Sequence, residues 1–347
     1  MIYSLILSLR DAHYRNGRHS SKAAVPTVCV GNISAGGTGK TPHTEMLLRE
    51  LLASDKWGAS NVAVLSRGYK RRSRGYQELP TDASAYLYGD EPAQIKHKFP
   101  GVTVAVDKNR IEACAKLAEG GTKMIVLDDA YQYRKLKADL NIVLSDYSNP
   151  VSTDSLLPAG YLRDLKKRLY DSDIVIVTKC PYELDDSEKQ EAAATLGYES
   201  YDPATCVAVH KGNSQLLFFT RICYDKPEPV FPGADTRYIY SHKLVLFTGI
   251  ANDTPLVRYL SDSYKIVEQL HFPDHHKYNN GDVRRLKAAM RHNPTAAFAT
   301  TEKDAMRLRD LKKMPPQLQE RLFYLPISVE FLSGREHDIF CEKLMTI

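Results

Sequence analysis

Short apolar segments recur along the first half of the chain, and polar stretches with helical spacing separate several of them. The apolar segments are rich in Val and Ile, and each has the length of one strand. Because strands that are apolar on both faces must be covered on both faces, this alternation predicts a parallel sheet with helices on both sides. The predicted strands are residues 26–30, 62–65, 102–106, 124–127, 141–144 and 174–177, and the predicted helices include 42–52, 107–118 and 182–194.

The pattern changes after about Tyr201. Residues 206–220 and the proline-containing stretch 226–233 look like extended connections. Alternation then resumes, with strands at 244–247, 266–271 and 296–300, a final extended run at 322–331, and helices from Thr254 and at 282–290. The sequence therefore predicts an α/β fold in three parts: a parallel-sheet domain at 1–205, an extended linker at 206–240, and a second, smaller α/β domain at 241–347 whose final strand returns toward the linker.

A glycine-rich turn joins the first predicted strand to the helix at 42–52. In such a turn, backbone N–H groups and the helix N-terminus surround bound phosphates. A glycine cluster also arises in ordinary loops, but the order of strand, loop, Gly-Lys-Thr and helix favours a P-loop that binds ATP or GTP. Lys40 can reach the outer phosphates and Thr41 can bind Mg²⁺, although Ser34 stands where the consensus has Gly. The predicted nucleotide-binding residues are Ser34, Ala35, Gly36, Gly37, Thr38, Gly39, Lys40 and Thr41.

Two pairs of acidic residues could serve this site. Asp128 and Asp129 follow the strand at 124–127, where a Walker-B-like carboxylate would meet magnesium held by Thr41. The alternative for them is a cap or turn aspartate. Asp90 and Glu91 precede a proline suited to the first turn of a helix, and by themselves they make an ordinary capping sequence.

The second domain carries its own cluster of polar residues. His271, Asp274, His275 and His276 place three imidazoles and a carboxylate within six residues, which suits either zinc or an Asp/His pair that moves a proton. The segment 301–304, Thr-Glu-Lys-Asp, closes another strand, with helix capping as its alternative role.

Composition sets the broad class of protein. The chain has 347 residues, of which 43% are hydrophobic and 26% charged, and its formal charge of +5 is modest. These values are ordinary for a soluble globular protein, and the net charge by itself decides little. We expect no nucleic-acid partner. Six scattered cysteines suggest neither a zinc knuckle nor disulfides, so a reducing cytosol is expected. Three basic clusters suit either an anionic partner or solvated loops: Lys70, Arg71, Arg72 and Arg74; Arg134, Lys135 and Lys137; Arg163, Lys166, Lys167 and Arg168.

The N-terminal segment is amphipathic. Ile2, Leu5, Ile6 and Leu9 fall at helical spacing, which suits either a helix on a membrane surface or packing on the protein's own core. The segment is too short to span a bilayer and lacks the features of a secretory signal. The basic or titratable residues that follow it are Arg10, His13, Arg15, Arg18, His19 and Lys22.

Seven short motifs in one order give the chain a resemblance to a known family. They are the loop from Val30 to Pro42, Ser66-Arg67-Gly68-Tyr69, Gly89-Asp90-Glu91-Pro92, Leu127-Asp128-Asp129, Leu156-Leu157-Pro158-Ala159-Gly160, Phe272-Pro273-Asp274-His275-His276 and Thr301-Glu302-Lys303-Asp304. In this order they resemble the tetraacyldisaccharide 4'-kinase family of lipid A biosynthesis, and the match runs from the N-terminal helix to the last strand.

The resemblance implies a kinase that uses ATP and Mg²⁺ at the cytoplasmic face of the inner membrane. Such an enzyme phosphorylates the 4'-hydroxyl of an acylated disaccharide 1-phosphate to give lipid IVA, and we expect it to be a peripheral, monomeric protein. By this analogy Asp90, working with His275, takes the proton from the sugar hydroxyl. The implied catalytic residues are Asp90, His275, Asp129 and Arg163, and the implied metal ligands are Thr41, Asp128 and Glu91.

Three positions depart from the family pattern. Tyr133 stands where His is common, Asp164 where Glu is common, and Lys70 where Gly is common. Two other functions compete with the kinase: a P-loop switch or partitioning ATPase, and a soluble kinase for a small metabolite. Partitioning ATPases often carry a Lys just before the Gly-Gly of the loop, and this chain has Ala35 there. A soluble kinase would not need an apolar N-terminus.

Overall fold

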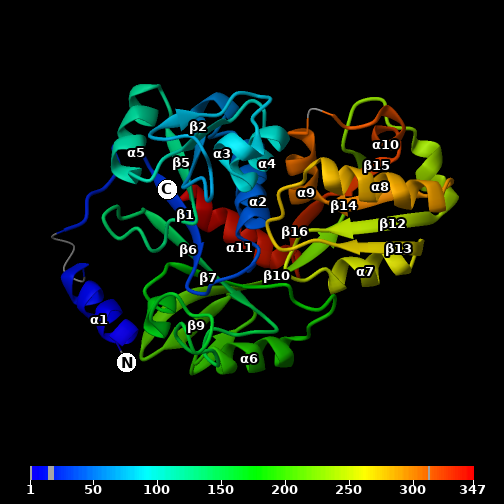
Figure 1. Cartoon of the computed structure of the whole chain (residues 1–347). Coiled ribbons are helices and arrows are strands. Elements are labelled where there is room, and N and C mark those ends of the chain that lie inside the picture. Colours follow the sequence, from blue (N-terminus) through cyan, green and yellow to red (C-terminus); the bar gives the residue numbers. More distant parts are fainter. Residues whose placement is uncertain (1, 15–18, 312) are drawn as a thin grey trace.

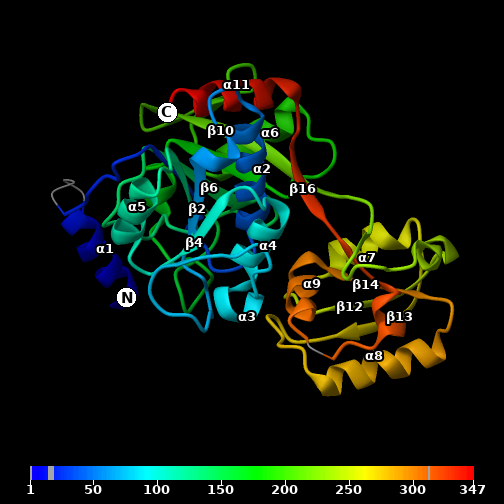
Figure 2. The same cartoon turned by 90° about the horizontal axis from the view of Figure 1, so that it is seen from above.

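A computed structural model describes residues 2–14, 19–311 and 313–347 of the chain (Figures 1 and 2). Two sheets, each with helices on both faces, form a larger and a smaller domain. This confirms the predicted α/β class. Among the N-terminal positions singled out above, Arg15, Arg18 and the side chain of Ile2 lie outside this description.

The larger sheet is built around six parallel strands that correspond to the six predicted apolar segments. Its order is β3-β4-β2-β5-β1-β6-β7-β10-β9-β8, and β16 pairs with β10. The parallel strands are β1 (Thr27–Asn32), β2 (Val62–Ser66), β4 (Thr103–Val106), β5 (Met124–Asp128), β6 (Leu140–Asp146) and β7 (Ile174–Thr178); β3 (Gln77–Glu78) is an antiparallel edge.

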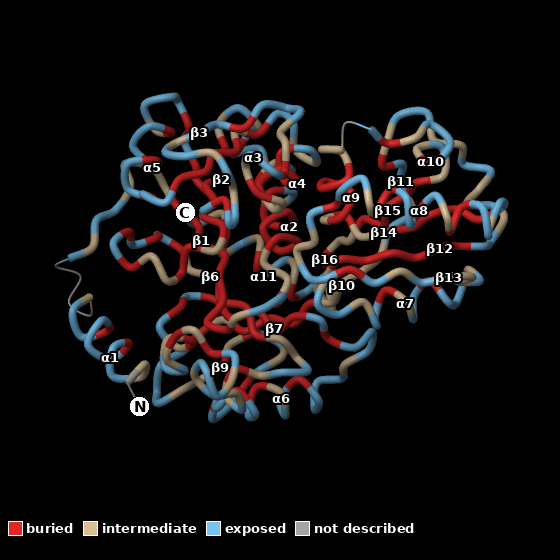
Figure 3. Tube along the Cα trace, viewed as in Figure 1, coloured by how far each residue is buried: buried red, intermediate tan, exposed pale blue. Residues whose placement is uncertain are grey.

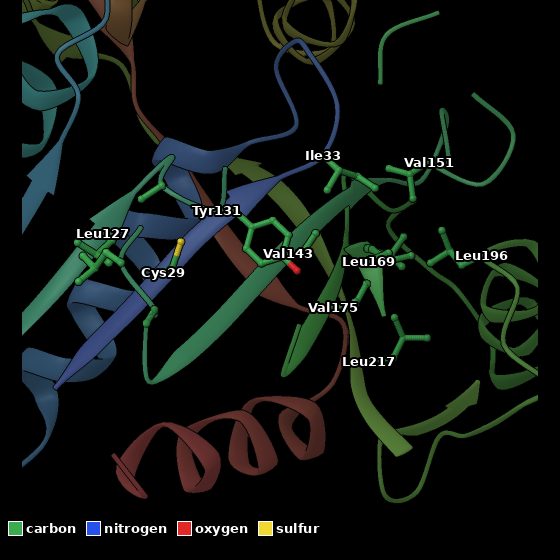
Figure 4. Close-up of a cluster of buried hydrophobic side chains, with 14 of the residues drawn as sticks. Cys29, Ile33, Leu127, Tyr131, Val143, Val151, Leu169, Val175, Leu196 and Leu217 are labelled. Atoms are coloured by element: carbon green, nitrogen blue, oxygen red, sulfur yellow. The ribbon is translucent and has the colours of Figure 1, made fainter. Parts of the chain in front are cut away.

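Alternate residues of the central strands enter two separate cores. In β1, Val28 and Val30 pack with α2, α4 and α11 on one face, whereas Cys29 packs with α5 and α6 on the other. Figure 3 shows these strands and α2 as buried, and Figure 4 shows the second core around Cys29, Leu127 and Val143. The helices are α2 (Lys40–Ala53), α4 (Asp90–Lys98), α5 (Arg110–Glu119), α6 (Asp186–Thr195) and α11 (Gly334–Met345). Short helices η1 (Ala59–Asn61), η2 (Lys166–Leu169) and α3 (Ala85–Tyr88) lie in the connections.

The segment that we expected to be a linker at 206–240 largely extends the larger sheet. Leu216 to Phe219 pair in parallel with Ile174 to Val177, because Leu217, Phe218 and Phe219 are apolar enough to be fully buried between the two cores. The strands involved are β8 (Ser200–Asp202), β9 (Val207–His210) and β10 (Asn213–Tyr224).

The second half of β10 leaves the larger sheet and runs toward the smaller domain. There Thr220 to Tyr224 pair antiparallel with β16 (Ile327–Phe331), so the chain crosses between the domains twice, side by side (Figure 2). After β16, α11 packs on the larger domain through Phe340 and Leu344. The last helix therefore lies outside the 241–347 unit that we expected, because its apolar face fits the larger core.

The smaller domain has a sheet of order β11-β15-β14-β12-β13, parallel except for β11. Helices α8 and α9 cover one face, and α7 and η3 cover the other. The strands are β11 (Glu228–Pro229), β12 (Lys243–Thr248), β13 (Lys265–His271), β14 (Ala297–Thr301) and β15 (Leu322–Leu325). The helices are η3 (Thr236–Ser241), α7 (Thr254–Ser261), α8 (Asn280–His292), α9 (Glu302–Arg309) and α10 (Pro316–Gln319).

The N-terminal helix α1 (Ile2–Tyr14) lies on the surface of the larger domain. Asp11 anchors it through Arg134 at 2.8 Å and through Lys167, and Leu7 is buried. Leu5, Ile6 and Leu9 instead point outward and are 61%, 55% and 64% exposed. These three residues of the stripe therefore do not pack on the protein's own core. Across the described residues, no helix has the length and apolar character needed to cross a membrane.

Candidate active site at the domain interface

The P-loop connects β1 to the N-terminus of α2. Gly36 and Gly39 have φ angles of 115° and 90°, which only glycine adopts readily. Three hydrogen bonds fix the loop: Ala35 N–H donates to the Tyr161 carbonyl at 2.6 Å, Asn32 donates to the Thr38 hydroxyl at 2.6 Å, and the Thr178 hydroxyl donates to the Thr38 carbonyl at 3.0 Å. A preformed loop that ends in a helix N-terminus suits the phosphates of a nucleotide.

Lys40, the first residue of α2, faces Asp129 at the end of β5, and their charged groups are 4.0 Å apart. Arg163 binds the same carboxylate with both terminal nitrogens, one at 3.2 Å, and also contacts Asn32. Burial raises the pKa of Asp129, but Lys40 and Arg163 outweigh it and lower the pKa overall. Asp129 is therefore a stable anion that holds two cationic side chains beside the P-loop.

Asp128 has a different environment, although it adjoins Asp129. Its side chain is buried and accepts hydrogen bonds from the hydroxyls of Ser66 at 3.0 Å and Thr44 at 3.3 Å. Burial, followed by the negative charges of Glu91 and Asp129, raises the pKa of Asp128 to about 6. Such a carboxylate is stabilised by an added cation.

The residues around Asp128 fit a magnesium ion. Mg²⁺ prefers carboxylate and hydroxyl oxygens, and Asp128 is a carboxylate whose donors are two neutral hydroxyl groups. Thr41 precedes Thr44 by three residues on α2 and so lies on the same helix face. Glu91 lies close enough to affect the pKa of both Asp128 and Lys40. Glu91 therefore lies near Asp128, and Thr41 lies on the helix face that carries Thr44.

Asp90, the first residue of α4, contacts His275 of the smaller domain, as the expected pair requires. His275 Nδ1 lies 3.3 Å from Asp90 Oδ2. Arg307 of α9 donates to the same oxygen from Nε at 2.9 Å and from Nη2 at 2.5 Å. Burial raises the pKa of Asp90, but hydrogen bonds from His275 and Arg307 outweigh it and lower the pKa to about 2. Asp90 is therefore ionised at neutral pH and oriented by the second domain.

Two glycines allow the start of α4 to approach the loop that follows β2. Gly89 has a φ of 101°, and a Cβ there would lie 3.2 Å from the Tyr69 carbonyl. Gly68 has a φ of 64°, and a Cβ there would lie 2.8 Å from the Tyr88 carbonyl. Tyr69 lies in this loop and makes an edge contact with the His275 ring, with the two ring centroids 5.9 Å apart. The two glycine motifs thus position Asp90 and His275.

Further ion pairs join α4 to α9. Glu91 pairs with Lys303 at 3.0 Å. At the other end of α4, Lys98 bridges Glu45 of α2 at 2.6 Å and Glu302 at 2.7 Å. Burial and the nearby charge of Glu45 raise the pKa of Glu302. The segment 301–304 therefore contributes ion pairs to the domain interface through Glu302 and Lys303. It also has the capping role that was the alternative, because the Thr301 hydroxyl accepts a hydrogen bond from Asp304 N–H and caps α9.

Sequence reasoning missed Arg307. It lies one helical turn after Lys303 and is also bound by Asp304 at 2.8 Å, but nothing in the sequence distinguishes it from an exposed arginine of an amphipathic helix. The imidazoles of 271–276 take separate partners: His271 pairs with Asp253, His275 with Asp90, and His276 with Asp282. This arrangement favours the Asp/His reading of the cluster over zinc.

The structure shows the surroundings of the three residues that depart from the family pattern. Lys70 has a φ of 57°, a conformation that favours the glycine expected there. The Tyr133 hydroxyl lies 3.3 Å from Asn109, and Asp164 is buried where it accepts from Arg134 at 2.9 Å. Asp164 thus helps to position Arg134, which in turn binds Asp11 of α1.

Comparison with known proteins identifies the family. The family description tetraacyldisaccharide-1-P 4'-kinase (LpxK) matches residues 1–345. The tetraacyldisaccharide 4'-kinase of Bacteroides thetaiotaomicron is 36% identical over 352 residues, covering 96% of this chain and 88% of the relative. That of Flavobacterium johnsoniae is 38% identical and covers 97% of this chain and 92% of the relative.

A solved structure has the same fold. It is the crystal structure of LpxK from Aquifex aeolicus in complex with ATP, which superposes with a TM-score of 0.71 at 24% identity, covering 99% of this chain and 95% of that one. The sequence relatives and the family description span nearly the whole chain. The chain therefore belongs to the tetraacyldisaccharide-1-P 4'-kinase family.

Proposed function

We propose that this protein transfers the γ-phosphate of ATP, with Mg²⁺, to the 4'-hydroxyl of a tetraacyldisaccharide 1-phosphate, giving lipid IVA in lipid A biosynthesis. One observation supports the proposal most directly: Asp90 is ionised and is held by Arg307 and His275. Its neighbour Glu91 carries a charge that affects the pKa values of Lys40 and Asp128. Phosphoryl transfer requires mainly positioning and charge compensation, with one base near the attacking hydroxyl.

The residues divide this work between them. Residues 34–41 bind the nucleotide, with Lys40 near its outer phosphates, and Asp129 keeps Lys40 and Arg163 beside the P-loop. Thr41, Asp128 and Glu91 would hold Mg²⁺, which compensates phosphate charge when bound. Asp90 accepts a hydrogen bond from the sugar hydroxyl. Because its pKa is low, Asp90 holds a proton weakly, and the proton passes on to His275 or to solvent.

The exposed outer face of α1 supports the proposal that the substrate is acylated. Leu5, Ile6 and Leu9 form an exposed apolar stripe, and the Tyr3 hydroxyl of the same helix donates to the Arg163 carbonyl at 2.9 Å. A helix of this kind binds a membrane surface with its apolar face inserted. We infer that the protein works as a monomer at the cytoplasmic face of the inner membrane, with the lipid substrate entering from the bilayer.

A transfer assay tests the proposed function directly. ATP labelled at its γ-phosphate and a tetraacyldisaccharide 1-phosphate in detergent micelles should yield labelled lipid. Lys40→Ala should lower the rate by about 10²-fold or more, because loss of charge stabilisation at a phosphoryl group costs about that much. Near wild-type turnover in Lys40→Ala would contradict the P-loop assignment, and label appearing only as free phosphate would indicate an ATPase.

The Asp90–His275 pair predicts non-additive kinetics. Asp90→Asn and His275→Ala should each lower kcat by about 10²- to 10⁴-fold with little change in ATP affinity. The double variant should be hardly slower than the slower single variant, because residues that act as one unit are not additive. His271→Ala, an exposed histidine paired with Asp253, is the matched control. Fully multiplicative losses would show that the two residues act independently.

The raised pKa of Asp128 predicts that replacing this residue increases stability but abolishes activity. The carboxyl has a pKa of about 6 when folded and an ordinary value of 3.8, so the folded state binds more protons between these values. The free energy of unfolding therefore falls as pH rises from about 4 to about 6. At pH 7 without metal, Asp128→Asn should raise that free energy by up to about 3 kcal/mol while abolishing transfer. Urea denaturation with and without Mg²⁺ measures this.

Magnesium should stabilise the wild type and have little effect on Asp128→Asn. If Asp128→Asn were instead less stable than the wild type at pH 7 without metal, the buried carboxylate would be stabilising, and the proposed cation site would be wrong.

The exposed stripe of α1 predicts a separable membrane defect. A variant with Leu5→Ser, Ile6→Ser and Leu9→Ser should bind anionic phospholipid vesicles more than tenfold more weakly, since burial of one such side chain contributes about 1.5–3 kcal/mol. Its Tm and its KM for ATP should stay unchanged, while KM for the acylated substrate rises. Tyr240→Ser, at a more exposed site of the smaller domain, is the control. Undiminished vesicle binding would rule out an interfacial role.

A further inference from the structure

A cluster of three metal-ligating side chains lies away from the candidate active site. Glu50 belongs to the last turn of α2, and His337 and Cys341 belong to α11. Within the described part of the chain, this is the one group of three His, Cys, Asp or Glu residues whose ligand atoms all lie within 4.8 Å of one another. We propose that Glu50, His337 and Cys341 bind a divalent transition metal ion of the zinc class, which links α11 to the P-loop helix α2.

Distances within the cluster fit one ion. Glu50 Oε2, His337 Nε2 and Cys341 Sγ form a triangle whose sides are 3.1, 3.4 and 3.5 Å. Tetrahedral zinc with its usual bond lengths to oxygen, nitrogen and sulfur would separate such ligand atoms by about 3.4–3.6 Å. Small movements of the side chains would therefore suffice, with no change in the backbone.

The sequence spacing also fits. His337 and Cys341 are four residues apart on one helix, so both project from the same face of α11 toward α2. His337 turns its other ring nitrogen, Nδ1, toward Asp338 at 3.7 Å. This distance is too long for a hydrogen bond, so a small movement of the exposed Asp338 side chain would be needed before it could orient a metal-bound histidine.

The donor set selects the kind of metal. A thiolate, an imidazole and a carboxylate together suit zinc or cobalt, whereas Mg²⁺ prefers oxygen ligands alone. All three residues are partly exposed, so the ion can enter from solvent and water can supply a fourth ligand. On binding, the Cys341 thiol becomes a thiolate and its proton passes to solvent.

Such an ion would fix the end of the chain. The apolar side of α11 packs on the larger domain through Phe340 and Leu344, and Glu336 accepts from the Phe219 N–H at 2.9 Å and pairs with Lys189 at 2.5 Å. The metal would add a link to α2, whose other end carries Lys40, from the same side of α11, since Cys341 packs against the core that contains Phe340 and Leu344. Its role would be structural, and the transfer chemistry does not depend on it.

Cobalt and zinc provide the test with the whole protein. The wild type should bind one Co²⁺ with a thiolate-to-metal charge-transfer band, and Zn²⁺ should displace the cobalt and raise the Tm. Cys341→Ser should remove the band, and His337→Ala and Glu50→Gln should weaken Zn²⁺ binding by more than the roughly 10–100-fold typical of an outer-shell partner. Asp338→Asn should show that smaller loss.

Controls separate this site from adventitious binding. Cys223→Ser, a partly buried thiol on β10, and His292→Ala, an exposed histidine on α8, should leave the band and the Tm increase unchanged. If Cys341→Ser fails to fold, Glu50→Gln and His337→Ala still decide the matter, because both side chains are partly exposed. A charge-transfer band and a Zn²⁺-induced Tm shift that survive these substitutions would overturn the proposal and leave a hydrogen-bonded surface triad.

Discussion

The candidate site depends on the ion pairs that hold α4 of the larger domain against α9 of the smaller one. Asp90 binds Arg307 at the start of α4, Glu91 binds Lys303 beside it, and Lys98 binds Glu302 at its far end. Partly buried ion pairs give little net stability, because desolvation offsets their attraction. They are, however, directional, so their main effect is to fix how the two domains meet. Together with the paired strands β10 and β16, this contact places His275 beside Asp90.

Among the four carboxyl groups of the candidate site, Asp128 differs in the direction of its pKa shift. Asp90, Glu91 and Asp129 each face a lysine or an arginine, and their pKa values are lowered accordingly. Asp128 has two hydroxyl donors and two acidic neighbours, and its pKa is raised. A protein selected for stability alone would have little reason to bury a carboxylate in this way. The arrangement supports the proposed cation site, because a bound cation would compensate the charge of Asp128.

Sequence patterns predicted the fold correctly for strands that are buried on both faces along their whole length. The strands before the P-loop and before Asp128 were recognisable because nearly every residue in them is apolar and buried. Residues 206–220 were misread because polar residues such as His210 and Gln215 interrupt the pattern. Phe218 and Phe219 are buried by elements distant in sequence, among them β7, β16 and α11. Arg307 could not be found for a related reason: its partner Asp90 lies 217 positions earlier. Local patterns report local structure, whereas these contacts are set by tertiary packing.

Three strand-to-helix units bring the residues of the site to one region. β1 leads to Lys40 at the start of α2, the loop after β2 reaches Asp90 at the start of α4 through Gly68 and Gly89, and β14 leads through Thr301 to α9. The N-termini of these helices carry partial positive charge, which favours acidic side chains and phosphate groups alike. The acidic residues at the start of α4 and α9 use that potential in the protein alone. At α2, glycine leaves it available, because Gly39 caps the helix without a side chain of its own.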